Sequence, residues 1–132
     1  MTAVHDLNVL LKTMRPHLND GQFVFVMIDE TKSDLLMHAV ATILEPEGIS
    51  AILPEKVAQM NGLSYDFVAA WITLTVNSAL QAVGLTAAFA KALGDANISC
   101  NVVAGLNHDH IFVPVNRAED AMQVLQALSQ LE

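Results

Sequence analysis

A stretch punctuated by glycines, residues 73–105, constrains the fold more than any other part of the chain. It reads TLTVNSALQAVGLTAAFAKALGDANISCNVVAG. The strand that opens it alternates between two faces, and an apolar stripe at helical spacing follows until Gly94. The pattern predicts a strand, a turn containing Gly84, an amphipathic helix, and a second strand at residues 98–104.

The rest of the sequence supplies strands and helices around this stretch. In chain order it predicts an amphipathic helix at residues 7–14 that ends near Pro16, strands at residues 23–28, 37–44 and 49–53, a short helix from Pro54 to a stop at Gly62, a strand at residues 70–77, a strand at residues 111–115 and a last helix at residues 121–131. Every position of the first strand is apolar, which predicts burial on both faces. Asn116 and Glu119 have the spacing of a capping box for the last helix.

The composition predicts an oligomer with a large apolar core. The chain has 132 residues, of which 53% are hydrophobic and 15% are charged, and its mean hydropathy is +0.42. One small domain cannot bury so much apolar surface, so we expect a homodimer or a higher homo-oligomer. Trp71, with Thr73 and Thr75, lies on the second face of its strand, where either core packing or a subunit contact would cover it.

Charge and segment length exclude several partners and locations. The formal net charge is −8, and no basic stripe offsets it, so neither nucleic acid nor an anionic membrane is an expected partner. The clean apolar runs are too short for a membrane span. The N-terminus, MTAVHDLNVLLK, lacks the features of a signal peptide. The lone Cys100 suits a reducing cytoplasm, so we expect a cytoplasmic protein.

The glycine-punctuated stretch resembles the front of an ACT domain, a small regulatory module that binds amino acids. The residues that carry the resemblance are Val76-Asn77-Ser78, the turn at residues 81–85, the helix at residues 86–93, and residues 94–103. The most specific phrases are WITLTVNSALQAVGLTAAF and ISCNVVAGLNHDHIFVPV. The whole chain is similar to small bacterial stand-alone proteins with two ACT-like units, and to the paired regulatory units of aspartokinases and arginine-sensing proteins.

The resemblance implies an α+β, ferredoxin-like fold in which two intertwined units have antiparallel sheets and helices on one face. The units would span residues 1–65 and 66–132. The implied function is non-catalytic, regulatory binding of a small molecule such as an amino acid, without a cofactor. An unidentified partner protein would read the ligand-linked change.

The chain departs from the βαββαβ order of an ACT unit in three places. It ends directly after a helix, so the second unit needs a final strand from the N-terminal half, for which residues 23–28 are the candidate. Only residues 29–36 stand where the first unit should have a first helix. Six clear strands take the place of the eight in two full units.

The turn after Asn77 is the candidate ligand site. A turn from a strand into a helix offers unpaired backbone N–H groups and the positive end of the helix dipole, which suit a carboxylate. Asn77 and Ser78 would add polar contacts, and Gly84 permits close approach of the backbone. Alternatively, Ser78 and Gln81 form a capping box and nothing binds. The resemblance assigns ligand contacts to Asn77, Ser78, Val83, Gly84, Leu85, Thr86 and Asn101.

Other polar groups admit different functions. His108-Asp109-His110 would support a metal-dependent enzyme, although no partner cluster is visible and a solvated hairpin tip is the simpler interpretation, so we expect no metal. Cys100 alternates with apolar neighbours, as a buried and inert thiol does. Asp29 and Glu30 end a strand and would bind an ammonium group or cap a helix. A purely structural oligomerisation module is a further alternative.

Overall fold

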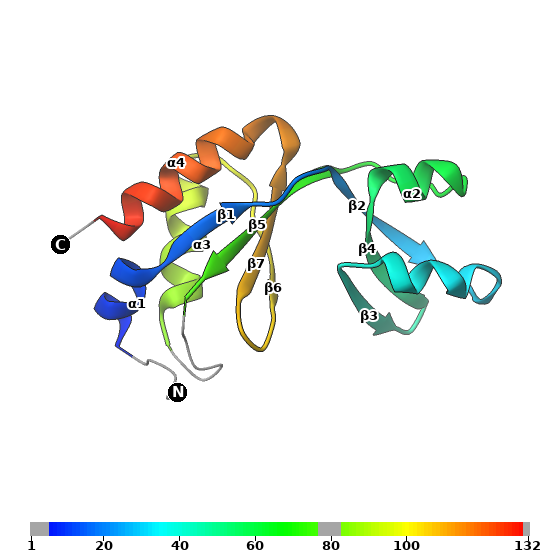
Figure 1. Cartoon of the computed structure of the whole chain (residues 1–132), viewed down its shortest axis with the longest axis horizontal. Helices are drawn as coiled ribbons and strands as arrows, with labels where there is room; N and C mark the ends of the chain where they lie inside the picture. The colour runs from blue at the N-terminus through cyan, green and yellow to red at the C-terminus, as the bar shows by residue number, and fades with distance from the viewer. Residues whose placement is uncertain (1–5, 77–82, 131–132) are drawn as a thin grey trace.

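The strands join into one antiparallel sheet in the computed structural model, which describes residues 6–76 and 83–130. They are β1 (Arg15–Leu18), β2 (Phe23–Ile28), β3 (Ala41–Glu45), β4 (Gly48–Pro54), β5 (Val68–Thr75), β6 (Asn101–Ala104) and β7 (Asp109–Pro114). The strand order is β3-β4-β2-β5-β7-β6, and β1 pairs with β5 next to β2 (Figure 1).

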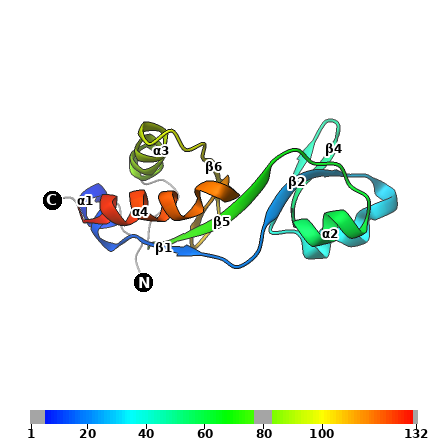
Figure 2. The same cartoon turned by 90° about the horizontal axis from the view of Figure 1, so that it is seen from above.

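The helices lie on one face of this sheet. They are α1 (Leu7–Thr13), the 3₁₀ segment η1 (Glu30–His38), α2 (Glu55–Met60), α3 (Leu85–Asp95), the 3₁₀ turn η2 (Val115–Arg117) and α4 (Ala118–Ser129). Val68 packs with the core under η1 and α2, whereas Ala70 packs with the core under α3 and α4. Residues two apart on a strand share a face, so both groups of helices cover the same side of the sheet. The sheet twists between the halves, so that α3 lies above the strands and α2 below them in Figure 2.

Two ferredoxin-like arrangements share strand β5. The first half of the molecule, from β2 to α2, has the order β3-β4-β2 and continues into the start of β5. The second half contains β5, α3, β6, β7 and α4, together with α1 and β1 from the start of the chain. Its strand order is β6-β7-β5-β1, which confirms the predicted fold class. The division at residues 65 and 66 stays a prediction.

The strand that completes the second half is β1, and the expectation that residues 23–28 supply it is wrong. Pro16 lies opposite Leu74, in a segment that the sequence pattern assigned to the end of a helix. Pro lacks a backbone N–H and is tolerated at the edge of a sheet, which is where β1 pairs. The strand at residues 23–28 exists as β2, but it opens the first half.

Three further expectations need correction. Strand β2 is not buried on both faces, because Phe25 and Met27 are 37% and 45% exposed on the face without helices. The strand expected at residues 37–44 begins only at Ala41, since Met37 and His38 end η1. The capping box of the last helix is absent: η2 precedes α4, whose N-cap residue Arg117 makes no side-chain capping bond.

Helix α3 ends differently from the expected stop at Gly94. The helix continues through Gly94 and Asp95, and Asn97 takes the left-handed conformation with φ of 61°. The Ile98 N–H then donates to the Leu93 carbonyl at 2.9 Å, which satisfies an end carbonyl of the helix. Asn is one of the few residues that tolerates this conformation.

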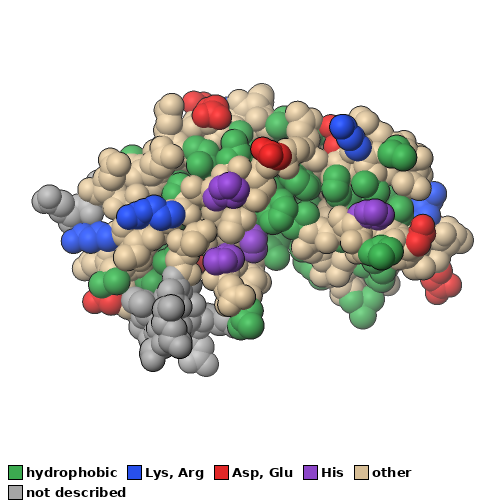
Figure 3. All heavy atoms as spheres, viewed as in Figure 1, with side chains coloured by type: hydrophobic (Ala, Val, Ile, Leu, Met, Phe, Trp, Pro, Cys, Tyr) green, Lys and Arg blue, Asp and Glu red, His purple; other side chains and the backbone are tan. Residues whose placement is uncertain are grey.

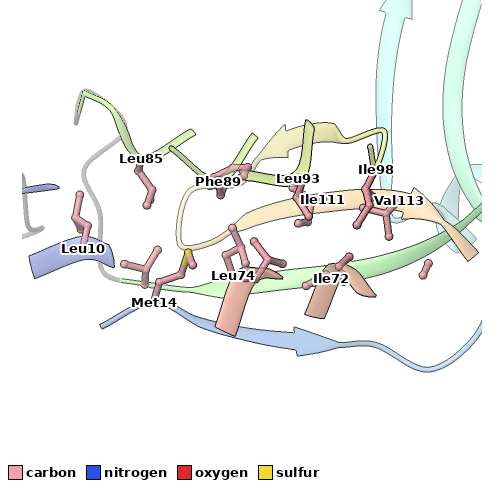
Figure 4. Packing of buried hydrophobic residues seen from close by; sticks show 14 residues of the cluster. Leu10, Met14, Ile72, Leu74, Leu85, Phe89, Leu93, Ile98, Ile111 and Val113 are labelled. Atoms are coloured by element: carbon pink, nitrogen blue, oxygen red, sulfur yellow. The ribbon is translucent and has the colours of Figure 1, made fainter. Parts of the chain in front are cut away.

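The main core lies between the sheet and helices α1, α3 and α4 (Figure 4). Leu10 and Met14 from the start of the chain are fully buried there, next to Leu74 of β5 and Phe89 of α3. The chain start is therefore an integral part of the second half. Within the described ranges, no helix is long and apolar enough to cross a bilayer.

Candidate functional site

Gly84 shapes the turn that enters α3. Its φ of 103° and ψ of −21° lie in the left-handed region, where glycine is favoured because it lacks a Cβ. Its carbonyl accepts the Ala88 N–H at 2.9 Å, the first bond of the helix. The N–H groups of the three residues between them precede the intrahelical ladder, so they face the turn together with the positive end of the helix dipole.

The predicted site residues around Gly84 differ in what they offer to a ligand. Val83 is 83% exposed, and Thr86 is also exposed, so both border solvent at the start of α3. Leu85 is 3% exposed and packs into the main core, which leaves its backbone as the only contact for a ligand. Asn77 and Ser78, with the alternative capping residue Gln81, lie outside the described residues.

Asn101 is not brought to this turn. It is the first residue of β6, and its side-chain amide lies 3.5 Å from the Phe112 carbonyl of β7. Asn101 pairs with Phe112, whose neighbours Ile111 and Val113 face the helices, so Asn101 lies on the opposite face of the sheet from α3. It also lies at the end of α3 remote from Gly84, about 16 Å along the helix axis.

The His108-Asp109-His110 segment is not simply a hairpin tip. His108 is exposed in the β6–β7 turn, which the Gly105 N–H closes on the His108 carbonyl at 2.9 Å. His110 instead lies on the sheet, where its Nδ1 accepts the Trp71 indole N–H at 3.0 Å. Burial lowers the pKa of His110, with His108 adding to the effect and Asp109 opposing it. Sequence periodicity could not reveal the Trp71 contact, because it depends on the register between β5 and β7.

Among the described residues, the groups considered for catalysis form no metal-ligand cluster and include no activated thiol. Among residues 6–76 and 83–130, no three His, Cys, Asp or Glu side chains come together in an arrangement that would hold a metal ion. Burial raises the pKa of Cys100 to about 11, so its thiol is protonated at neutral pH. A protonated thiol is a poor nucleophile, which agrees with the predicted inert role.

A pocket of about 430 Å³ lies at the corresponding turn of the first half, between the end of β2, the start of η1 and the β3–β4 hairpin. Its apolar walls include Met27, Leu36 and Leu44, and its polar groups include Asp29, Glu30, Ser33 and Glu47. Asp29 caps η1, since its carboxylate accepts the Thr31 N–H at 2.9 Å and the Thr31 hydroxyl. These bonds lower the pKa of Asp29, so it is charged at neutral pH. The capping role expected for Asp29 is confirmed.

The chain belongs to the ACT domain family. Two sequence profiles described as ACT domain match it, one over residues 2–70 and the other over residues 67–127. A solved structure from Vibrio cholerae, described as a protein of unknown function and a possible transport protein, is 45% identical. The match covers 94% of this chain and 96% of that one, with a TM-score of 0.84. A comparison with curated protein sequences gave no significant match.

More distant structures share the fold. The ligand-free regulatory subunit of aspartate kinase from Thermus thermophilus is 10% identical, with 92% of this chain and 99% of that chain covered and a TM-score of 0.66. Aspartate kinase from Clostridium acetobutylicum, described as an allosteric enzyme, is also 10% identical, with 89% and 34% covered and a TM-score of 0.61. Identities this low show the fold alone.

Proposed function

We propose that this protein is a non-catalytic regulatory module that binds a small molecule, specifically an amino acid. Membership of the ACT family and the fold shared with an aspartate kinase regulatory subunit support the proposal. The single observation that carries it is the left-handed conformation of Gly84, which begins α3 at a glycine whose own side chain cannot cap the first N–H groups of the helix.

The turn would hold the carboxylate of the ligand. The backbone N–H groups of Leu85 and Thr86 lie at the positive end of α3, where an anion is stabilised. Val83 offers an exposed apolar side chain for the aliphatic part of the ligand. Asn77 and Ser78 would add the polar contacts that fix its orientation. Asn101 lies on the far face of its own sheet, so it would join such a site only from a second subunit.

The pocket beside η1 is a second candidate site. Its volume of about 430 Å³ lies within the range of small-molecule sites, roughly 300–1,000 Å³. Asp29 is charged and would attract the ammonium group of an amino acid, while Met27 and Leu44 would contact its side chain. The two turns would attract ligand groups of opposite charge, because the turn of the first half offers carboxylates and the turn of the second half offers backbone N–H donors.

Ligand binding would be linked to assembly as a homodimer or higher oligomer. Phe25, Met27 and Ile43 are exposed on the sheet face that carries no helices, and a second subunit would cover them. A ligand that prefers one packing of the units stabilises that packing, and a partner protein would read the difference. Light scattering at micromolar concentration tests the assembly, and a monomeric mass would contradict it.

A thermal-shift screen of the twenty amino acids tests the binding function. We expect one of them, or a chemically related few, to raise the melting temperature of the wild-type protein selectively. Titration calorimetry would then compare Asn77→Ala with Asn116→Ala, a matched control that lies at the opposite end of α3. Loss of one polar contact of about 0.5–1.5 kcal/mol weakens binding by roughly two- to tenfold, and the control should bind normally.

The same experiment separates the two candidate sites. If the η1 pocket holds the ligand, Asp29→Asn weakens binding and Asn77→Ala does not. Unchanged affinity in both folded variants would place the site elsewhere. A melting temperature that responds to a chelator but to no amino acid would favour the metal-dependent alternative at His108-Asp109-His110.

A further inference from the structure

A hydrogen-bond network centred on His110 joins strands β5 and β7 to the segment between β1 and β2, on the face without helices. The Trp71 Nε1 lies 3.0 Å from His110 Nδ1, and the Thr73 Oγ1 lies 3.2 Å from the same nitrogen. The indole N–H can only donate, so Nδ1 must accept. His110 is therefore neutral and carries its proton on Nε2.

The network extends to the connection between the two halves. The Asn19 side-chain amide donates to the Thr73 hydroxyl at 2.9 Å and to the Trp71 carbonyl at 3.2 Å. The backbone N–H of Asn19 donates to the same carbonyl at 2.9 Å. Asn19 lies between β1 and β2, where the chain passes from the second half to the first (Figure 2).

Trp71 is also part of the aromatic contact between the halves. Its ring packs edge-on against Phe23 of β2, with centroids 5.3 Å apart, and stacks on Phe112 of β7 at 6.3 Å. Phe25 of β2 packs edge-on against Phe112 at 5.8 Å. Hydrophobic and histidine side chains lie close together where the halves meet (Figure 3).

Few backbone positions pair across the junction between the two halves. Strands β2 and β5 pair at two positions only, Phe23 with Ala69 and Val24 with Val68. Figure 1 shows the halves joined by the β1–β2 segment and β5. The side-chain contacts around Trp71 therefore supply much of what holds one half against the other.

Few charged groups face His110. His108 lies nearest, with ring centroids 6.4 Å apart, and Asp109 precedes it in the chain. Across β5, His17 of β1 pairs with Thr73 on the same face, whereas the Arg15 guanidinium is engaged by the Lys12 and Met14 carbonyls. On the β6 side, the uncharged Val103, which pairs with His110, is the residue that faces it. Burial and His108 lower the pKa of His110, and Asp109 raises it.

We propose that His110 is a proton-controlled latch on the junction between the two halves. In the neutral state, Nδ1 holds the Trp71 indole in place against Phe23 and Phe112. Protonation puts a hydrogen on Nδ1, so two N–H donors point at each other and the bond is lost. Trp71 then leaves its position, and the halves are free to change their relative orientation.

The chain contains a single tryptophan, which reports this change directly. The experiment follows the ¹H–¹⁵N signal of the Trp71 indole and its fluorescence in the 132-residue chain from pH 8 to pH 5.5, above the pI of about 4.8. We expect a sigmoidal shift of the indole signal with a midpoint below 6.5, a red shift of the emission, and unchanged far-ultraviolet circular dichroism.

Three variants assign the titration to His110. His110→Gln keeps a hydrogen-bond acceptor but cannot titrate, so the sigmoid should vanish. His108→Gln removes a repulsive charge and should raise the midpoint, whereas Asp109→Asn removes an attractive charge and should lower it. Because the two variants should shift the midpoint of the indole titration in opposite directions, they distinguish protonation of His110 from a general effect of acid.

Two results would overturn the latch. One is an indole signal that does not change between pH 8 and pH 5.5 in the wild-type protein. The other is a titration that persists in His110→Gln, which would assign it to another group. If His110→Gln fails to fold, the midpoints of His108→Gln and Asp109→Asn still decide, because equal midpoints in both variants contradict the proposal.

Discussion

Leu7 of α1 lies directly against Gly84 at the start of α3. A Cβ atom placed on Gly84 would lie 3.0 Å from Leu7 Cδ2 and 3.6 Å from Leu7 Cδ1. The start of the chain thus forms one wall of the turn that enters α3. Glycine at this position meets two independent requirements, a left-handed backbone and an absent side chain.

Gly84→Ala should destabilise the protein by about 1–3 kcal/mol, because alanine is strained at φ of 103° and its methyl group displaces Leu7. Gly62→Ala is the matched control, since Gly62 also has a positive φ, 67°, but has open space around its Cβ position. The free energy of unfolding in urea measures both. Equal losses in the two variants would show that the Leu7 contact contributes nothing.

Gly94→Ala should have the opposite effect. Gly94 lies inside α3, and apart from its chain neighbours and the helix backbone itself no described atom lies within 4 Å of where its Cβ would be. Alanine restricts the unfolded chain and favours the helix, so we expect a gain of roughly 0.5–1 kcal/mol in the free energy of unfolding. A loss of stability would instead show that the helix needs flexibility near its end.

Met14→Ala should lower the free energy of unfolding by about 2–5 kcal/mol, the usual range for a buried methionine. Met14 is fully buried between the sheet and the helices of the second half, although it lies near the start of the chain. Met60→Ala is the control, because Met60 is 84% exposed at the end of α2 and should change stability very little. Similar urea midpoints for the two variants would contradict the packing of the chain start in this core.

The sequence predicted the elements whose boundaries carry local signals. The start of helix α3 at its glycine turn, the turn of the β3–β4 hairpin and the stop at Gly62 all follow from apolar spacing and turn residues nearby in the chain. Strand β1 could not be predicted in this way. It is four residues long, it contains Pro16, and its partner β5 lies more than fifty residues away. Only the tertiary structure makes it a strand.

In the candidate site, too, only the features that depend on residues nearby in the chain could be predicted from the sequence. A turn at Gly84 was a local expectation, and the structure has a turn there, with a positive φ at the glycine. The separation of Asn101 from that turn depends on strand register and on the face that each residue occupies, which the pattern of β6 alone does not determine. The contact between Trp71 and His110 has the same origin, since it requires β5 and β7 to pair in one particular register.

Cys100 should react slowly with a thiol reagent while the protein is folded. Burial raises its pKa to about 11, so the reactive thiolate is scarce at pH 8. In urea the thiol regains its ordinary pKa, and the rate of alkylation should rise by at least tenfold. Mass spectrometry after timed exposure to iodoacetamide measures both rates. Equal rates in native and unfolded protein would contradict the partial burial of the thiol.

Stability should fall as the pH drops through 6.5, and His110 should account for part of the loss. Its pKa in the folded protein lies below the ordinary value of 6.5, chiefly because of burial. Between 6.5 and the folded pKa, the unfolded chain therefore binds more protons than the native one, and stability decreases with decreasing pH. Asp109 acts in the opposite sense, since burial raises its pKa above 3.8. Comparing the melting temperatures of wild type and His110→Gln at pH 8 and pH 6 cancels the contribution of Asp109. We expect the wild-type protein to lose more, and an equal loss in both would show that His110 titrates alike in the folded and unfolded states.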